Sequence, residues 1–205
     1  MINLTVEKSG LLVVTINRPG KVNALTTVML EQLLEIAHRA TEARGLILTG
    51  TGKVFSAGAD LDEAAAGLAL SPLWEQLSAA IAALPCLTVA ALNGTLAGGA
   101  NGMALACDLR ISVPGAKVFY PVMKLGYLPQ PSDARRMSAL IGPARTKLIL
   151  AGGQKILAQQ AYDFGLIDQI VEPLDLLPTA RSLMTDSLIA KPEIAQRILE
   201  MCQES

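Results

Sequence analysis

Strand-forming segments alternate with helical segments over the first two-thirds of this 205-residue chain, and helices dominate the last third. The predicted strands cover residues 2–7, 11–16, 45–50, 87–92, 108–113 and 117–120. Helices are predicted between them over residues 28–43, 61–66, 73–83 and 98–106. Alternation of this kind is typical of βαβ units, so it predicts an α/β fold with a mainly parallel sheet.

The pattern changes near residue 132, after a segment over residues 121–131 that contains three prolines and is predicted to be a loop. Beyond it, helices are predicted over residues 134–141, 144–151, 158–164, 174–189 and 192–202, with one short strand over 168–171. We therefore divide the chain into a core of residues 1–131 and a helical region of residues 132–205. The helical region is either a second unit or a further layer of the same domain.

Composition argues against several classes of protein. Hydrophobic residues make up 51% of the chain and charged residues 17%, which suffices for a packed core. The net charge is −1 and aromatic residues are only 3%, so no nucleic-acid partner is expected. No apolar run approaches the roughly 20 residues of a membrane span, and residues 1–7 lack a signal-peptide pattern. We therefore expect a cytoplasmic protein without a membrane partner.

Cysteine and histidine give no metal-binding pattern. Cys86, Cys107 and Cys202 lie in apolar or helical settings without metal-ligand spacing, so they are predicted to be reduced thiols. His38, the only histidine, lies among charged residues on a predicted helix and is interpreted as a solvated helix residue. No metal site is therefore expected.

Two stretches of small residues follow predicted strands, at residues 54–61 and 93–102. Small residues allow a backbone to approach a ligand or another backbone closely. We expect the two stretches to face each other and to point backbone N–H groups at one oxygen atom. Plain helix-on-strand packing is the alternative that either stretch alone would allow.

Several segments of the chain match a known family in their order and approximate spacing. They are residues 17–19 with 23–25, 55–61, 91–94 with 98–99, 106–111 and 161–168. On these segments the protein resembles the crotonase superfamily, that is, the enoyl-CoA hydratase/isomerase family. The resemblance implies a spiral of stacked ββα turns, followed by a helical region that often builds trimers or hexamers. A homo-oligomer is therefore expected, although the helical region is short relative to that family.

The resemblance also implies a ligand and a site. Members of the family bind acyl-CoA thioesters and stabilise an enolate, so coenzyme A is expected as part of the substrate and no cofactor as permanently bound. An acyl-carrier-protein thioester is the alternative substrate form. By the same resemblance, the two oxyanion-hole N–H groups belong to Ala57 and Gly99. The residues expected to line the CoA site are Lys21, Val22, Ala24, Gly58, Ala59, Asp60 and Leu61.

Simple chemistry agrees with this assignment. Enolate formation places negative charge on the thioester oxygen, and one pre-aimed N–H donor is worth ~3 kcal/mol to such a charge. Alanine and glycine leave the thioester room to approach these donors. Asp60, the nearest acid in sequence, is expected to hold its own loop and the following helix rather than to act as a base.

The acids that hydratases of this family use are missing. Those enzymes add water with two glutamates, and the corresponding positions here are Gly102 and Val122. A third acidic position, used by several isomerases of the family, aligns near Gln130. Because each acid–base group contributes about 10²–10⁴-fold in rate, ordinary hydration is not expected.

Decarboxylation needs no base, because loss of CO₂ generates the enolate and only a proton donor is required afterwards. Candidate donors are Tyr127, Lys124 and Asp133. Each also has a structural interpretation: Tyr127 packs on the sheet, Lys124 reaches solvent, and Asp133 or Ser132 caps the helix that follows. Polar side chains that could orient a substrate are Asn101 and Ser56.

Three functions therefore remain open. The first is a thioester enzyme with enolate chemistry other than standard hydration. The second narrows this to a decarboxylase of a CoA- or carrier-bound β-carboxy thioester. The third is a non-catalytic subunit that binds acyl thioesters or serves in assembly.

Overall fold

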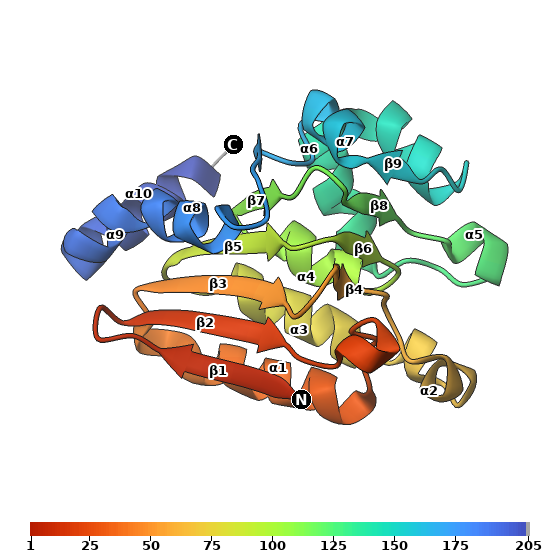
Figure 1. The fold of residues 1–205 in the computed structure, drawn as a ribbon, viewed down its shortest axis with the longest axis horizontal. Helices are drawn as coiled ribbons and strands as arrows, with labels where there is room; N and C mark the ends of the chain where they lie inside the picture. The colour runs from red at the N-terminus through yellow and green to blue at the C-terminus, as the bar shows by residue number, and fades with distance from the viewer. Residues whose placement is uncertain (204–205) are drawn as a thin grey trace.

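A computed structural model of the chain describes residues 1–203 and begins with a β-hairpin (Figure 1). Strands β1 (Ile2–Val6) and β2 (Leu11–Ile16) pair antiparallel. Gly10, at the turn between them, has a φ of +84°, which glycine adopts without strain. The predicted hairpin is confirmed.

The larger sheet contains the hairpin and four further strands, in the order β1-β2-β3-β5-β7-β10. The added strands are β3 (Gly45–Gly50), β5 (Leu87–Leu92), β7 (Leu109–Ser112) and β10 (Gln169–Ile170). Every pairing except β1 with β2 is parallel, as the alternation of strands and helices predicts. The central strands β3 and β5 are nearly continuous apolar runs because both faces of the sheet are covered there.

A second sheet, which the sequence did not reveal, lies beside the first in the order β4-β6-β8-β9. Its strands are β4 (Val54–Ser56), β6 (Thr95–Ala97), β8 (Lys117–Phe119) and β9 (Ile156–Leu157). Only β8 is predicted from sequence, as part of the segment 117–120, whereas β4, β6 and β9 are too short to show a periodic pattern. The chain passes from β3 to β4, from β5 to β6 and from β7 to β8, each time followed by a helix, which gives the spiral of ββα turns.

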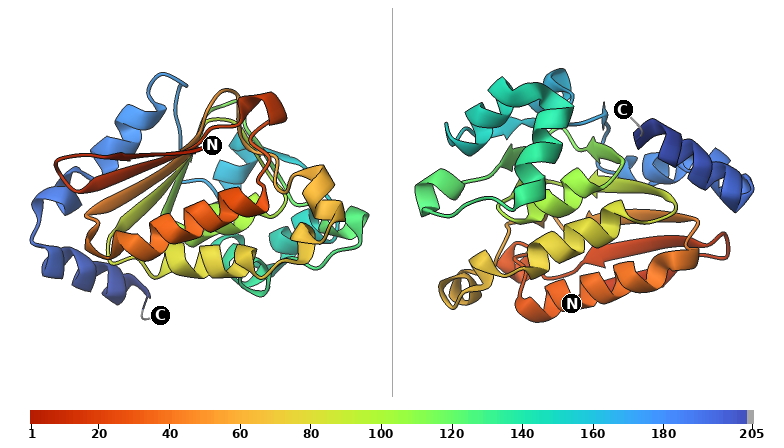
Figure 2. Two further views of the ribbon diagram at one scale, coloured as in Figure 1. Left: turned by 90° about the horizontal axis from the view of Figure 1, so that it is seen from below. Right: turned by 180° about the vertical axis from the view of Figure 1, so that it is seen from behind.

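Helices α1 (Thr27–Arg39), α3 (Leu73–Ala82) and α4 (Ala100–Ala106) lie side by side over one face of the larger sheet (Figure 2). The predicted cap of α1 is confirmed, because Thr26 Oγ1 accepts a hydrogen bond from the Met29 N–H at 3.3 Å. All seven residues of α4 are buried, as its uniformly apolar sequence predicts. The main hydrophobic core, to which these three helices contribute, also includes Leu48, Phe55 and Leu77.

The helical region covers the rest of the molecule with α6 (Pro131–Leu150), α7 (Ala158–Phe164), α8 (Leu176–Leu183), α9 (Thr185–Ile189) and α10 (Pro192–Gln203). Met137 and Ile141 of α6 belong to the main core. Leu176 and Ala180 of α8 pack in a second cluster, which contains Ile47 from the opposite face of the larger sheet. The division of the chain near residue 131 stays a prediction.

Two details of the region around residue 131 differ from the sequence predictions. The segment 121–131 is not all loop, because it contains the short helix α5 (Val122–Leu125), which ends at Gly126 with a φ of +72°. Helix α6 begins at Pro131, whose fixed φ suits a first helical position. Neither Ser132 nor Asp133 caps it, since both lie inside its first turn. The two helices predicted over 134–141 and 144–151 are confirmed, because Gly142, with a non-helical φ of +77° and ψ of 161°, separates them within α6.

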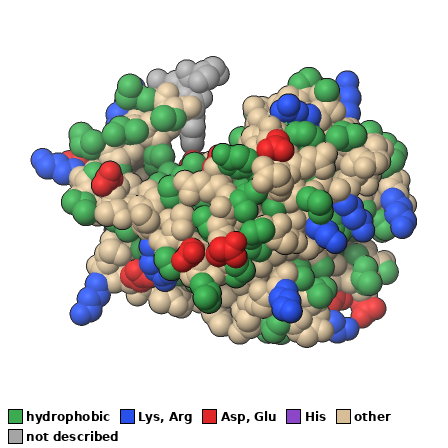
Figure 3. Space-filling view, turned by 45° about the horizontal axis from the view of Figure 1, so that its top comes forward, with side chains coloured by type: hydrophobic (Ala, Val, Ile, Leu, Met, Phe, Trp, Pro, Cys, Tyr) green, Lys and Arg blue, Asp and Glu red, His purple; other side chains and the backbone are tan. Residues whose placement is uncertain are grey.

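Other expectations concern reactive and charged groups. Cys86 and Cys107 are buried, and burial raises the pKa of both thiols to about 12, whereas Cys202 is exposed. His38 is exposed on α1. Within residues 1–203, no group of three or more acidic, cysteine or histidine side chains is placed to hold a metal ion. Figure 3 shows one face of the molecule, where charged side chains of both signs are scattered.

Within residues 1–203, no helix combines the length and the apolar character that a transmembrane segment requires. Helix α2 (Leu61–Ala65) completes the set of α-helices and follows the first small-residue stretch.

Candidate active site

The two small-residue stretches meet, as predicted. Strand β4 pairs parallel with β6, and Gly58 lies against Ala97 and Gly98 of the second stretch. A Cβ atom on Gly58 would lie 2.9 Å from the Ala97 carbonyl oxygen and 3.2 Å from the Gly98 Cα. Gly58 also has a φ of +90°, so both space and backbone conformation require glycine there.

A cavity of about 210 Å³ opens at this junction. Its wall combines both small-residue stretches, the indole of Trp74, and the segment from Tyr120 to Gln130. The lining residues are Ala57, Ala59, Leu61, Ala64, Ala69, Trp74, Gly98, Gly99, Tyr120, Pro121, Val122, Leu125, Tyr127, Leu128 and Gln130. Among the described residues, this lining includes no charged side chain.

Several backbone N–H groups in the wall have no acceptor within residues 1–203, and those of Ala59 and Gly99 come from the two small-residue stretches. The Ala57 N–H is engaged, because it donates to the Val22 carbonyl at 3.1 Å. The assignment of an oxyanion donor to Ala57 is therefore corrected, and Ala59 is the residue of this loop with a free donor. Gly99 is held close to Trp74, since a Cβ on it would lie 3.0 Å from the indole.

The hydrogen bonds of the Ala59 loop explain the correction. Leu25 N–H donates to the Gly58 carbonyl at 2.8 Å, and Asp60 N–H donates to the Leu25 carbonyl at 2.8 Å. Successive N–H groups of an extended backbone point in opposite directions, so Ala59 N–H faces away from residue 25. The sequence identifies the loop but does not reveal this alternation.

A second cavity, of about 440 Å³, adjoins the first and shares Ala57, Ala59 and Leu61 with it. Its remaining lining residues are Gly20, Lys21, Val22, Ala24, Asp60 and Asp62. The structure thus brings together all the residues predicted for the CoA site except Gly58, which lies between the two loops.

The loop that carries Val22 is held in an unusual conformation. Val22 and Asn23 have φ values of +48° and +55°, a region that asparagine tolerates far better than valine. The buried Asn23 side chain accepts a hydrogen bond from Arg18 N–H at 2.9 Å and donates to the carbonyls of Thr51 and Val54 at 2.9 and 2.7 Å. These three bonds fix the backbone around the second cavity.

Asp60 has the structural role that was predicted. Its carboxylate forms an ion pair with Arg18 at 2.6 Å and caps α2 by accepting hydrogen bonds from the N–H groups of Asp62 and Glu63. The hydrogen bond from Arg18 is the main cause that lowers the pKa of Asp60. An anion with these partners is a poor base.

The positions of the missing acids lie at the same cavity. Val122 is buried in its wall, and Gln130 lines it. Gly102 lies in α4, where a Cβ would be 2.8 Å from Oδ1 of Asp133. The space beside α4 at residue 102 is therefore filled by a carboxylate from α6.

Asp133 lies behind the cavity wall and is joined to it by Tyr120. The Tyr120 hydroxyl donates a hydrogen bond to Asp133 Oδ2 at 2.9 Å. Asp133 is fully buried, and its Oδ1 has no hydrogen-bond partner among the described residues. Burial raises the pKa of Asp133 to about 6, and burial beside Asp133 also raises the pKa of Tyr120. Sequence reasoning missed Tyr120, since nothing in its pattern distinguishes it from a core aromatic residue.

The other candidate side chains differ in whether they reach the cavity. Tyr127 is half-buried in the cavity wall, whereas Lys124 is exposed and outside the lining. Asn101 donates to the carbonyls of Gly98 and Phe119, so it holds the loop.

Ser56 likewise serves the backbone of the site. Its hydroxyl donates to the Asn23 carbonyl at 2.8 Å and accepts a hydrogen bond from the Gly58 N–H at 3.1 Å. Ser56 therefore positions the loop rather than a substrate.

Comparison with known proteins identifies the family. The family model described as enoyl-CoA hydratase/isomerase matches residues 6–204. The chain belongs to the enoyl-CoA hydratase/isomerase family. Its two-sheet spiral with a helical region is the crotonase fold: an enoyl-CoA hydratase from Bacillus anthracis superposes with a TM-score of 0.90 at 28% identity, over 99% of this chain and 82% of the other.

Relatives of this family member have more than one activity in their names. A short-chain-enoyl-CoA hydratase of Clostridium acetobutylicum is 32% identical over 206 residues, 96% of this chain and 78% of its own length. An ethylmalonyl-CoA decarboxylase of Bos taurus is 28% identical over 218 residues, 99% of this chain and 71% of its own length. The family assignment therefore leaves the reaction to be argued from the site.

Proposed function

We propose that this protein is an enolate-forming enzyme of acyl-CoA thioesters, and that it releases CO₂ from a β-carboxy thioester of the malonyl type. The observation that carries the proposal is the composition of the cavity wall. Two unpartnered N–H groups, on Ala59 and Gly99, lie in a lining without a charged side chain.

The N–H groups of Ala59 and Gly99 are the proposed oxyanion hole. When the bond between the substrate's α-carbon and its carboxylate breaks, the electron pair moves into the enolate and charge develops on the thioester oxygen. Donors fixed in place before the reaction stabilise that charge by ~3 kcal/mol each. CO₂ departs, and one proton must then be added to the α-carbon.

The apolar wall favours loss of the carboxylate. Val122 and Leu125 contribute hydrocarbon where a charged group of the substrate would lie. A carboxylate without polar partners is poorly solvated, whereas CO₂ is neutral, so apolar surroundings favour the neutral product.

The same wall lacks the acid–base groups that hydration requires. Water addition requires a base that contacts the attacking water, and Gly102 and Val122 provide none. Asp60 is paired with Arg18, and Asp133 is shielded from the cavity by Tyr120. Each absent acid–base group costs about 10²–10⁴-fold in rate.

The second cavity is the proposed site of the CoA moiety. It shares Ala57, Ala59 and Leu61 with the first cavity, so a ligand can pass from one to the other. Lys21, exposed at its rim, offers positive charge to the phosphates of CoA. Relatives with CoA-thioester names support CoA over a carrier protein.

A substrate panel tests the proposal. Purified protein is incubated with ethylmalonyl-CoA, methylmalonyl-CoA and crotonyl-CoA, while CO₂ release and water addition are measured separately. We expect CO₂ from at least one malonyl-type thioester and no water addition to crotonyl-CoA. Robust hydration would overturn the assignment, and calorimetric binding of CoA thioesters without turnover would favour a non-catalytic subunit.

A further inference from the structure

Three elements bring their side chains together behind the cavity. Helix α4 contributes Gly102, the chain after β8 contributes Tyr120, and α6 contributes Asp133. Absence of a side chain at Gly102 leaves the space that the Asp133 carboxylate occupies. Tyr120 lies in the cavity wall and Asp133 does not, so the phenol connects the acid with the cavity.

We propose that Tyr120 is the catalytic residue that protonates the enolate carbon, and that Asp133 is a positioning residue that orients the phenol and replaces its proton. This inference rests on the proposed function, because it requires an enolate in the cavity. It replaces Tyr127 as the donor, since Tyr127 lines the cavity but has no hydrogen bond to an acid among residues 1–203.

The proton balance of the step is simple. The O–H bond of Tyr120 breaks as a C–H bond forms at the α-carbon, while the Asp133 carboxyl gives its proton to the Tyr120 oxygen. The enolate charge ends on the Asp133 carboxylate, so no tyrosinate persists. Solvent then returns one proton to Asp133. The net reaction consumes one proton and one malonyl-type thioester and yields one CO₂ and the shortened thioester.

We call the proton transfer from Asp133 through Tyr120 to the enolate the relay. The direction of the hydrogen bond between Tyr120 and Asp133 decides whether the phenol proton can reach the enolate. When Asp133 is ionised, the Tyr120 hydroxyl donates to Oδ2 and its hydrogen points away from the cavity. When Asp133 is protonated, the carboxyl donates to the Tyr120 oxygen, and the phenol hydrogen is free to face the enolate. The protonated form also suits the unpartnered Oδ1, because a neutral carboxyl group loses less than an anion when it lacks a hydrogen bond.

Burial, rather than the surrounding charges, favours the protonated form of Asp133 by raising its pKa. The hydrogen bond from Tyr120 is the next largest effect and lowers this pKa, while Glu75 of α3 raises it and Arg136 of α6 lowers it. Arg136 is held away by hydrogen bonds to the hydroxyls of Ser132 and Ser78 at 2.7 and 3.1 Å. Helix α4 contributes no titratable side chain, because Ala100–Ala106 contains none.

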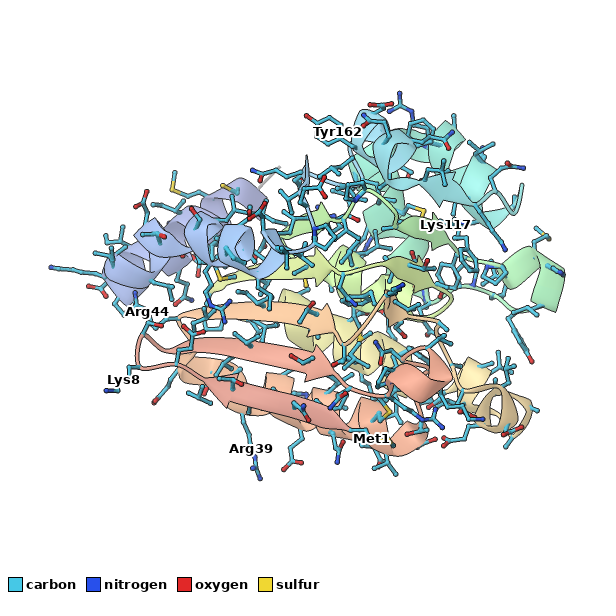
Figure 4. All side chains as sticks on the ribbon, in the orientation of Figure 1. Met1, Lys8, Arg39, Arg44, Lys117 and Tyr162 are labelled. Atoms are coloured by element: carbon cyan, nitrogen blue, oxygen red, sulfur yellow. The ribbon has the colours of Figure 1, made fainter. Side chains whose placement is uncertain are left out.

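The test uses the variants Tyr120→Phe and Asp133→Asn with two matched controls. Tyr162→Phe removes a phenol from the outer surface of α7 (Figure 4), and Asp186→Asn changes an exposed acid on α9. CO₂ release from the best malonyl-type substrate is followed between pH 5 and pH 9, and the reaction is repeated in D₂O to locate deuterium at the α-carbon.

We expect wild-type kcat to fall as the pH rises through the titration of Asp133, and deuterium to enter one face of the α-carbon. Both site variants should lose about 10²–10⁴-fold in kcat with little change in KM, and Asp133→Asn should also lose the pH dependence. In both site variants, deuterium should enter the two faces of the α-carbon equally. Because the two residues act as one unit, the double variant should be no slower than either single variant. The controls should match the wild type.

Two failures are distinguishable. If the wild type releases CO₂ but Asp133→Asn keeps its rate and pH profile, the relay is wrong and the proposed function stands. If the wild type forms no product from any thioester, the proposed function is wrong and the relay falls with it. Should Tyr120→Phe fail to fold, the near-isosteric Asp133→Asn variant decides the outcome.

Discussion

Replacing Asp133 with asparagine should change how stability depends on pH. Asp133 is fully buried, its carboxyl group has one hydrogen bond among the described residues, and its pKa is raised from 3.8 to about 6, chiefly by burial. Between these values the folded protein binds a proton that the unfolded chain releases. The free energy of unfolding therefore falls as the pH rises through this window. A shift of about two units corresponds to roughly 3 kcal/mol.

Asparagine has nearly the same shape and does not titrate. Other ionisable groups contribute equally to both proteins, so they cancel in the difference. The free energy of unfolding of Asp133→Asn, relative to wild type, should therefore rise by about 3 kcal/mol between pH 4 and pH 8. Any effect of the substitution that is the same at every pH cancels when the two pH values are compared.

Urea unfolding at several pH values measures this difference. Trp74, the only tryptophan, is buried against the site and reports unfolding by its fluorescence. The exposed Asp186→Asn variant serves as the control and should follow the wild-type profile. A difference between Asp133→Asn and wild type that stays constant from pH 4 to pH 8 would refute the reasoning.

Three further substitutions test other parts of the site. Gly99→Ala places a Cβ 3.0 Å from the Trp74 indole, so thioester turnover should fall about 10²-fold, measured as kcat, while calorimetric affinity for free CoA is retained. Gly102→Glu puts a second buried carboxylate against Asp133 and should cost about 3–5 kcal/mol in urea unfolding, most of it recovered by adding Asp133→Gly. Asn23→Ala removes three buried hydrogen bonds and should cost about 3 kcal/mol in the same assay; an unchanged midpoint would contradict the loop's proposed dependence on Asn23.

The elements that were predictable from sequence are those with long apolar patterns. Strand β3, strand β5 and helix α4 each bury nearly every residue, so a continuous apolar run identifies them. The second sheet was not predictable, because β4 and β6 have three residues each and exist only through pairing with each other. Local sequence carries no information about that partner.

The site shows the same limit at the level of single atoms. Small residues at 54–61 and 93–102 predict close approach of two loops, and the structure confirms it at Gly58. Which N–H of the first loop is free depends on the bridge between Leu25 and Ala59, formed by residues more than thirty positions apart. The pairing of Tyr120 with Asp133 likewise arises from the way α6 folds back over α4.

The placement of the acid, rather than its mere presence, separates the reactions that the proposed site favours. A base for hydration must be ionised and in contact with water, and Asp133 is buried behind Tyr120, with one oxygen that has no partner in the described part of the chain. Such a group holds a proton more readily than it accepts one from a cavity water. An acid that reaches the cavity only through a phenol hydroxyl is suited to delivering one proton after the carbanion has formed. Decarboxylation forms that carbanion without a base, so the reaction then requires only a proton donor. Asp133, acting through Tyr120, is suited to be that donor.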